Sequence, residues 1–341
     1  MDRRAALLAL TLVALALAGM PRGRAAGPTY VHGELVGGAH WTLDGSPYIL
    51  VGNTTVPGDS FLGIDAGVQV RADRGVGLTV LGGLAVQGTA AQPVRFSPNS
   101  TGVDAGFWRG IRSVNSWAIT ISHAIVEGAE SAYGVEGGLA VIDGSSFSVS
   151  FRGLEVHGGG VDVTQSSFSQ NTEAGVAAGG NLYSTVTIGG SLFANNYASM
   201  NLDTTLALVE NSTFLAPSMA DFVLNNTAIT VRASPYAGPI KLVDATSTLT
   251  VDALLAVSVT DAYATPQAGV HVLVEDNANG SERLEVVTSV KGRAPLLAVR
   301  ERAFGGGWGP LGVNFNPFAV TTTIGSTHVA ENVTAHLRTN V

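Results

Sequence analysis

The feature that most constrains this chain is a repeat of 21 to 25 residues built around a Ser-x-Phe centre. Four segments carry it: Ser145-Ser146-Phe147, Ser166-Ser167-Phe168, Ser191-Leu192-Phe193 and Ser212-Thr213-Phe214. The Phe residues are 21, 25 and 21 residues apart, and an earlier unit fits if Val126 takes the place of Phe. Helix-turn-helix repeats need roughly 33 residues or more, so this period leaves a leucine-rich repeat or a β-solenoid.

Alignment of these units produces columns of aliphatic residues. Five residues before each Phe position stand Ile121, Ile142, Val163, Ile188 and Val209. Seven before stand Ile119, Ala140, Val161, Val186 and Ala207, and nine after stand Val135, Val156, Ala177, Leu202 and Val223. Residues two apart on a strand point to the same side, so the first two columns predict one buried interior. The column between them, which we expect to point outward, contains Thr120, Val141, Asp162, Thr187 and Leu208.

A β-solenoid fits these columns better than a leucine-rich repeat does. The Leu-x-x-Leu-x-Leu frame is missing, whereas short β-branched runs separated by Gly, Asn and Ser predict coils of three short strands. Coils stacked about 4.8 Å apart bury each column against the next. Asn171 and Asn196, each three residues after its Phe, fit a corner where they stack as a ladder. Two unrelated turn residues are the alternative.

The stretch before the repeat continues the pattern with weaker periodicity. Short strands are expected at Thr54–Pro57, Gly67–Val70, Leu78–Val80, Leu84–Val86, Pro93–Phe96 and Trp108–Ile111. The run from Pro47 to Phe96, Trp108-Arg109-Gly110-Ile111 and Ile121-Ser122-His123-Ala124 resembles right-handed parallel β-helix proteins of the pectin-lyase-like superfamily, especially exported archaeal and bacterial members. The resemblance covers roughly residues 42–235 and implies a fold more than an activity.

The register ends near Pro235–Pro239, and longer alternating strands follow. They are expected at Thr248–Val259, Val270–Glu275, Ala319–Thr323 and Val333–Leu337, and they predict a small antiparallel β-sandwich. The segment from Asp261 to Val270 resembles a loop of carboxypeptidase-regulatory-like, immunoglobulin-type modules, which implies a spacer or stalk; Ala264 stands where that pattern usually has Gly. The expected fold is all-β: a signal peptide and spacer at 1–26, a right-handed parallel β-helix with an N-terminal cap at 27–236, and the sandwich at 243–341.

The N-terminus predicts export. Arg3 and Arg4 precede an apolar run from Ala5 to Ala18, and small residues stand before Gly19. This is the pattern of a secretory signal peptide, shorter than the roughly 20 residues of a membrane-spanning helix. We therefore expect a secreted or cell-surface protein with no transmembrane helix beyond this segment. In that setting six sequons are glycosylation candidates: Asn53, Asn99, Asn211, Asn225, Asn279 and Asn332.

Charge and motif context exclude several functions. The net charge is −8 and the basic residues are scattered, so nucleic acid is not an expected partner. His157-Gly158-Gly159-Gly160 matches an esterase oxyanion string, but no Gly-x-Ser-x-Gly elbow accompanies it. The Gly residues from Gly307 to Gly312 have the spacing of a dinucleotide-binding motif. That motif must be followed by a helix, which Pro310 disfavours. Cys is absent and no His pair has metal-ligand spacing, so no metal or cofactor is expected.

Asp143 and Asp162 are the candidate catalytic residues. Their places in the repeat put both side chains outward on adjoining coils, with Cα atoms roughly 8 Å apart. Inverting glycosidases hold their carboxyl groups about 6.5–9.5 Å apart, so this spacing permits a polysaccharide hydrolase. Against it, no third carboxylate joins them in register, and the Arg-x-Lys string of the superfamily's hydrolases is absent. A lyase of this fold would need Ca²⁺ carboxylates plus a base, for which Arg152 is the nearest candidate.

Aromatic residues supply the remaining candidates. Trp108, Trp117 and Tyr133 are of the type that stacks sugar rings, with core packing as the alternative.

The sequence thus favours an exported, non-catalytic structural or adhesive protein that binds glycan or a cell-surface protein along the solenoid. The alternative is a polysaccharide hydrolase or lyase centred on Asp143 and Asp162. A membrane-associated periplasmic accessory protein would need a metal or partner site that the sequence does not offer.

Overall fold

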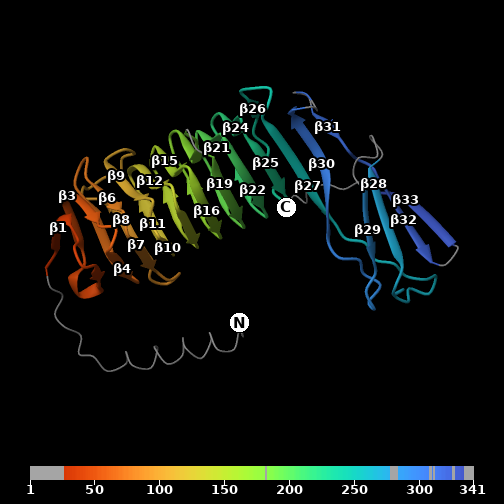
Figure 1. Ribbon diagram of the computed structural model, residues 1–341, viewed down its shortest axis with the longest axis horizontal. Coiled ribbons are helices and arrows are strands. Elements are labelled where there is room, and N and C mark those ends of the chain that lie inside the picture. The colour runs from red at the N-terminus through yellow and green to blue at the C-terminus, as the bar shows by residue number, and fades with distance from the viewer. Residues whose placement is uncertain are drawn as a thin grey trace.

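The chain forms a parallel β-solenoid followed by a small antiparallel module (Figure 1). The computed structural model describes residues 27–180, 183–276, 283–306, 309, 312–324 and 327–333. Within these residues there is no α-helix and one short 3-10 turn, Leu43–Gly45. In Figure 1 the coils run from β1 at the red end to β25 and β27, and the blue strands of the module follow. The predicted segment 1–26 lies outside the described residues.

Each coil contributes strands to three faces, which we number in relation to the repeat. Face I contains β2 (Ala39–Trp41), β4 (Phe61–Asp65), β7 (Gly83–Gln87), β10 (Ala118–Ser122), β13 (Leu139–Asp143), β16 (Gly159–Thr164), β19 (Ser184–Gly189), β22 (Thr205–Glu210), β25 (Ala228–Arg232) and β27 (Thr248–Leu255). These ten strands are paired in parallel, which defines ten coils.

Face II consists of the short strands that carry the Ser-x-Phe centres and their predecessors. They are β5 (Gln69–Ala72), β8 (Val94–Pro98), β11 (Ala124–Glu127), β14 (Ser146–Ser148), β17 (Ser167–Ser169), β20 (Leu192–Ala194) and β23 (Thr213–Leu215). Face III contains β6 (Gly77–Val80), β9 (Trp108–Val114), β12 (Ala129–Glu136), β15 (Arg152–His157), β18 (Ala174–Ala178), β21 (Ala198–Asp203), β24 (Ala220–Asn225) and β26 (Ile240–Leu242). The long first strands, β1 (Thr29–Glu34) and β3 (Tyr48–Val56), span both of these faces.

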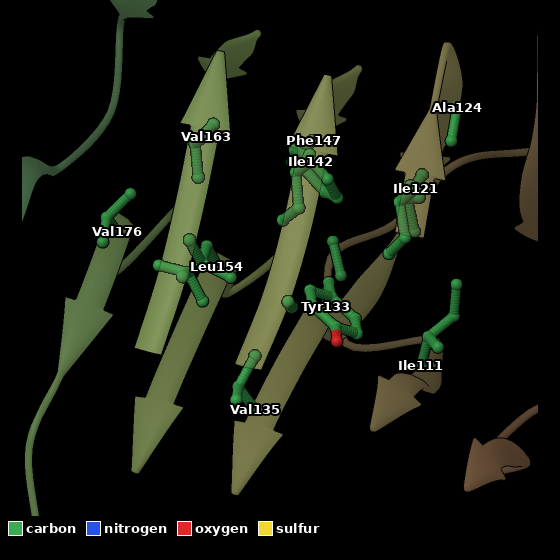
Figure 2. Close-up of a cluster of buried hydrophobic side chains, with 14 of the residues drawn as sticks. Ile111, Ile121, Ala124, Tyr133, Val135, Ile142, Phe147, Leu154, Val163 and Val176 are labelled. Atoms are coloured by element: carbon green, nitrogen blue, oxygen red, sulfur yellow. The ribbon is translucent and has the colours of Figure 1, made fainter. Parts of the chain in front are cut away.

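The aliphatic columns of the repeat form the interior. Ile121 pairs with Ile142, which pairs with Val163, and the column seven residues before each Phe pairs in the same way. Figure 2 shows these side chains meeting Leu154 and Tyr133 from face III between the sheets. The outward column through Val141 and Asp162 is also confirmed.

The column nine residues after each Phe is wrong in two coils. Ala178 and Leu224, not Ala177 and Val223, pair with the buried residues of the neighbouring strands. The corner between faces II and III is one residue longer in these coils: Val176 follows Phe168 by eight residues, whereas Leu154 follows Phe147 by seven. An added corner residue moves the following strand by one position and so exchanges its buried and exposed sides.

Identical side chains stack along the coils. Phe147, Phe168, Phe193 and Phe214 form one stack with ring centroids 5.4, 5.0 and 4.7 Å apart. The predicted Asn ladder is confirmed: Asn171 Nδ2 donates to Asn196 Oδ1 at 3.0 Å, and Asn171 Oδ1 accepts from the Ser150 backbone N–H at 3.1 Å.

A buried Ser column lines the other corner of face II. Each hydroxyl oxygen accepts a backbone N–H from the preceding coil, as Ser166 does from Ser145 and Ser191 does from Ser166, both at 3.1 Å. Ser is therefore repeated before each Phe because its side chain satisfies a buried turn amide.

The C-terminal module is an antiparallel pair of sheets that shares a strand with the solenoid. β27 pairs with β25 in parallel and with β30 (Leu297–Gly305) in antiparallel fashion, and β31 (Val313–Asn314) extends that sheet. The second sheet has the order β29 (Arg283–Val287), β28 (His271–Asp276), β32 (Phe318–Ile324) and β33 (Thr327–Val333). Buried residues such as Val272, Val299 and Phe318 lie between them.

Two details of the sequence analysis change here. The solenoid extends beyond residue 236, because β26 and β27 continue faces III and I. β29, β30 and β31 are not among the expected strands. β33 covers Thr327–Val333, whereas all but the first residue of the strand expected at Val333–Leu337 lies outside the described residues. In the described part of the chain, no helix has the length and apolar character needed to cross a membrane.

Candidate functional site

A polar groove of about 650 Å³ lies on face III, over β3, β6, β9, β12 and β15. Its shallow end is lined by Asn53 and Thr55 of β3 and Thr79 of β6. Most of its charged side chains come from the next three strands: Arg109, Arg112, Glu130, Glu136, Arg152, Glu155 and His157. These strands hold the groups because alternate residues of each strand point outward from the solenoid.

Glycine residues form the floor of the groove. Gly134 occupies the outward position between Arg112 of β9 and Glu155 of β15; it has no side chain and is itself buried among its neighbours. A Cβ atom there would lie 3.8 Å from the Arg112 Cγ atom, which is ordinary contact. Gly110 is different: its φ is +97°, and a Cβ atom would lie 1.7 Å from the Ser131 carbonyl oxygen.

The groove coincides with a break in the strand register. Ser131 pairs with Gly110 but Tyr133 pairs with Ile111, so β12 has one residue more than β9 between these pairs. From β12 onward the pairing is regular again, with Tyr133 opposite Leu154. The extra residue is a β-bulge, a feature that re-aims neighbouring side chains.

Glu155 is the centre of a hydrogen-bonded cluster. Ser131 Oγ donates to Glu155 Oε2, and Arg152 Nη1 lies 3.3 Å from Oε1. His157 Nε2 lies 2.9 Å from the same Oε1, while its Nδ1 atom lies 2.8 Å from the Gly179 carbonyl oxygen. Arg152 also reaches Glu173 Oε2 at 2.6 Å. The carboxylate is thus held from three sides.

The surroundings of Glu155 favour its ionised form. Burial alone would raise the pKa of this carboxyl group. The hydrogen bonds from Ser131 and His157 and the positive charges of Arg152 and His157 outweigh burial and lower the pKa. Glu155 is therefore a fixed anion and hydrogen-bond acceptor at neutral pH rather than a proton donor.

The second charged pair of the groove joins Arg112 to Glu136, whose side chains are hydrogen bonded across β9 and β12. The register also places Arg109 opposite Glu130, and both side chains are exposed. The groove therefore offers guanidinium donors beside carboxylate acceptors along its length. Such an array can bind a polar chain through hydrogen bonds.

No metal centre is indicated within the described ranges, where no three His, Asp or Glu side chains are grouped to hold an ion. Two carboxylates of the groove, Glu136 and Glu155, are instead paired with Arg side chains.

Asp143 and Asp162 lie on face I, away from the groove. Their strands have the expected offset, since Asp143 pairs with Thr164 and Val141 pairs with Asp162. Asp143 Oδ1 accepts a hydrogen bond from Thr164 Oγ1 at 2.6 Å, and Asp162 is exposed. Arg152 belongs to face III, so it cannot serve these carboxylates as the base of a lyase.

Two of the three aromatic candidates are core residues. Trp108 is 1% exposed and Tyr133 is 0% exposed, so neither presents a ring face to a sugar. Burial raises the pKa of Tyr133, although the Tyr133 hydroxyl is hydrogen bonded to Ser113 Oγ at 2.8 Å. Trp117 is 63% exposed, contacts Phe61, and donates its indole N–H to the Gly58 carbonyl oxygen at 3.1 Å.

The sequons differ in their surroundings. Asn53 is exposed at the end of the groove, and its Oδ1 atom accepts the Gly77 backbone N–H at 3.1 Å. Asn99 and Asn211 are exposed and Asn225 is half-buried. Asn279 lies outside the described residues, as does the side chain of Asn332.

Sequence reasoning missed the groove. Arg109, Arg112 and Glu136 belong to β9 and β12, whose pairing contains the register shift, and Glu155 belongs to β15, which pairs regularly with β12. Composition does not mark this region, because the eight Asp, Glu, Lys and Arg residues among the 49 residues from 109 to 157 are close to the 13% of the whole chain.

These observations define a β-solenoid protein with a charged groove on one face and an antiparallel module at its C-terminal end. Comparisons with family models, curated proteins and solved structures found no match to this chain.

Proposed function

We propose that the protein is an exported, non-catalytic glycan-binding protein whose ligand lies in the groove of face III. The observation that carries this proposal is the groove itself: an open channel of about 650 Å³, lined by alternating guanidinium and carboxylate groups over a glycine floor. Carbohydrate sites combine hydrogen-bond donors and acceptors in this way because each sugar hydroxyl can both donate and accept. An open channel accommodates part of a longer chain, which suits a polysaccharide.

The cellular setting of this proposal rests on the sequence. The apolar run from Ala5 to Ala18 has the pattern of a secretory signal peptide, and the sequons suit a glycosylated exported protein. The resemblance to the pectin-lyase-like superfamily and to carboxypeptidase-regulatory-like, immunoglobulin-type modules suggests a binding solenoid carried on a stalk. Fold analogy of this kind supports export and a stalk-like module, but it does not identify a ligand.

A polysaccharide hydrolase at Asp143 and Asp162 is the second candidate. Their two-residue offset on the neighbouring strands β13 and β16 supports it, because such an offset corresponds to Cα atoms roughly 8 Å apart. Neither residue lines the groove. A hydrolase would therefore act on face I, where Thr164 holds one of the two carboxylates.

A glycan array with the purified protein tests the proposal, and Gly134→Leu identifies the site. The Cβ atom fits at residue 134, and the rest of the Leu side chain would fill the groove between Arg112 and Glu155. We expect affinity for the bound glycan to fall at least about tenfold, which equals roughly 1.4 kcal/mol. Ala177→Leu is the matched control, since it adds the same outward side chain one coil beyond Glu155.

The same preparations separate the two candidates. Binding that survives in Asp143→Asn and Asp162→Asn, without release of shortened glycan, supports the binding protein. Glycan cleavage that both substitutions abolish would replace it with the hydrolase.

A further inference from the structure

We infer that the groove selects a neutral, hydroxyl-rich polysaccharide and discriminates against polyanionic chains. This inference rests on the proposed function and specifies the class of ligand. Its basis is the balance and pairing of charges along the groove rather than the presence of any single residue.

The fixed charges of the groove cancel. Its lining contains three Arg residues, at 109, 112 and 152, and three Glu residues, at 130, 136 and 155. His157 is the remaining titratable group, and it contacts Glu155. The whole chain has a net charge of −8. The permanent charges of the Arg and Glu side chains therefore give a polyanion no net attraction in the groove, and the net charge of the chain does not favour its approach.

Each positive group near the centre already has a carboxylate partner. Arg112 contacts Glu136, and Arg152 lies between Glu155 at 3.3 Å and Glu173 at 2.6 Å. An anionic sugar that binds either Arg must displace a carboxylate or lie beside one. Displacement loses an existing charge-assisted hydrogen bond, and a position beside the carboxylate adds repulsion between like charges.

The same pairs suit neutral hydroxyl groups. A guanidinium has five N–H donors and a carboxylate about four acceptor positions, and one ion pair uses only part of them. Adjacent hydroxyls of a sugar can therefore accept from the Arg and donate to the Glu of one pair without breaking it. Gly134, between Arg112 and Glu155, has no side chain, which leaves space beside these groups.

Isothermal titration of matched oligosaccharides tests this inference. The probes are hexasaccharides of glucose, mannose and xylose, and oligouronates of the same length, each at about 50 and 200 mM salt. We expect at least one neutral oligomer to bind at least about tenfold more tightly than any oligouronate. We also expect its affinity to change less than about twofold with salt, because no charge is neutralised on binding.

Glu136→Gln sharpens the test by freeing Arg112 from its carboxylate. The substitution should narrow the preference for the neutral oligomer by about threefold or more, since Arg112 then becomes available to an anion. Glu285→Gln is the control, because Glu285 is an exposed carboxylate in β29 of the C-terminal module.

The outcomes distinguish the inference from the proposed function. Preferential binding of an oligouronate that Gly134→Leu abolishes would overturn the inference and leave the groove as a glycan site. Failure to bind any glycan, or binding that Gly134→Leu leaves unchanged, would overturn the proposed function itself.

Discussion

The coils from β17 to β25 differ from those between β3 and β12 in how strictly they repeat. In the later coils each column holds nearly the same side chain, as in the Phe stack, the Asn ladder and the Ser column. In the earlier coils a loop separates β8 from β9, and the register changes between β9 and β12. The groove lies over this irregular part and the adjoining strand β15. Repeated side chains thus stack into continuous columns, whereas the groove lies where the repeat is interrupted.

Phe168→Ala should have the largest effect on the regular coils. Phe168 is fully buried between Phe147 and Phe193, at ring-centroid distances of 5.4 and 5.0 Å. Removing its ring leaves a cavity, and we expect the free energy of unfolding to fall by about 3–5 kcal/mol in urea titration. Val141→Ala, on the outer side of face I, should change it by less than about 0.5 kcal/mol. A similar loss of unfolding free energy in both variants would contradict the proposal that the Phe stack stabilises the solenoid.

Gly110→Ala tests the backbone of the groove coils. The positive φ of Gly110 and the close Ser131 carbonyl oxygen exclude a Cβ atom without a shift of β9 against β12. We expect a loss of about 3 kcal/mol in the free energy of unfolding. Gly134→Ala is the matched substitution, two residues past the bulge in β12, and should stay within about 0.5 kcal/mol of the unmodified protein. Equal losses of unfolding free energy in the two variants would show that Gly110 is not needed for the register shift between β9 and β12.

Asn171→Ala should have an intermediate effect in the regular coils. It removes the acceptor of the Ser150 N–H and the Asn171 donor to the Phe147 carbonyl oxygen. A buried amide left without a partner costs about 1–3 kcal/mol, so we expect a loss of about 2 kcal/mol in urea titration. Asn201→Ala, an exposed position on β21, is the control. A loss below about 0.5 kcal/mol would indicate that the ladder is dispensable.

Glu155→Gln should have the smallest effect on stability, and the effect should depend on pH. Because the folded pKa of Glu155 is lowered, its ionised form stabilises the fold at pH values above the unfolded pKa of about 4.3. That contribution is lost as the pH falls through the folded pKa. We expect a loss below about 1 kcal/mol at pH 7, because the cluster is partly exposed, and a smaller one at pH 3.

Thermal unfolding of the Glu155→Gln variant and of the unmodified protein across this range measures the difference. Glu130→Gln, at an exposed position of the same groove, is the matched control. A loss that grows toward low pH would contradict the direction of the Glu155 shift.

The solenoid could be predicted from the sequence because its columns repeat one residue type at a fixed interval. Ile121, Ile142 and Val163 identify their own partners in this way. Ala177 takes the interior place of Ala178 in the sequence alignment because the spacing of 25 residues from Phe168 to Phe193 shows that residues are added in this coil but not that one of them lies in the corner. Register errors of this size reverse the side of a strand.

The candidate site could not be predicted, since it depends on contacts between irregular strands. Glu155 meets Ser131 only because β12 and β15 are paired as they are, and no linear pattern links these two residues. The carboxylates that the repeat did bring into register, Asp143 and Asp162, lie on a different face. The repeat therefore predicts the solenoid, but it does not predict the groove, whose side chains are not part of the repeated columns.

The double pairing of β27 also has a consequence for the behaviour of the protein in a crowded solution. A parallel solenoid ends in a strand whose free N–H and C=O groups can recruit another chain and begin aggregation. From Thr248 to Asp252, β27 is bonded to β25 on one side and to β30 on the other. The last strand of face I is therefore not an open edge. The C-terminal module prevents another chain from pairing with it and extending the sheet into a fibre.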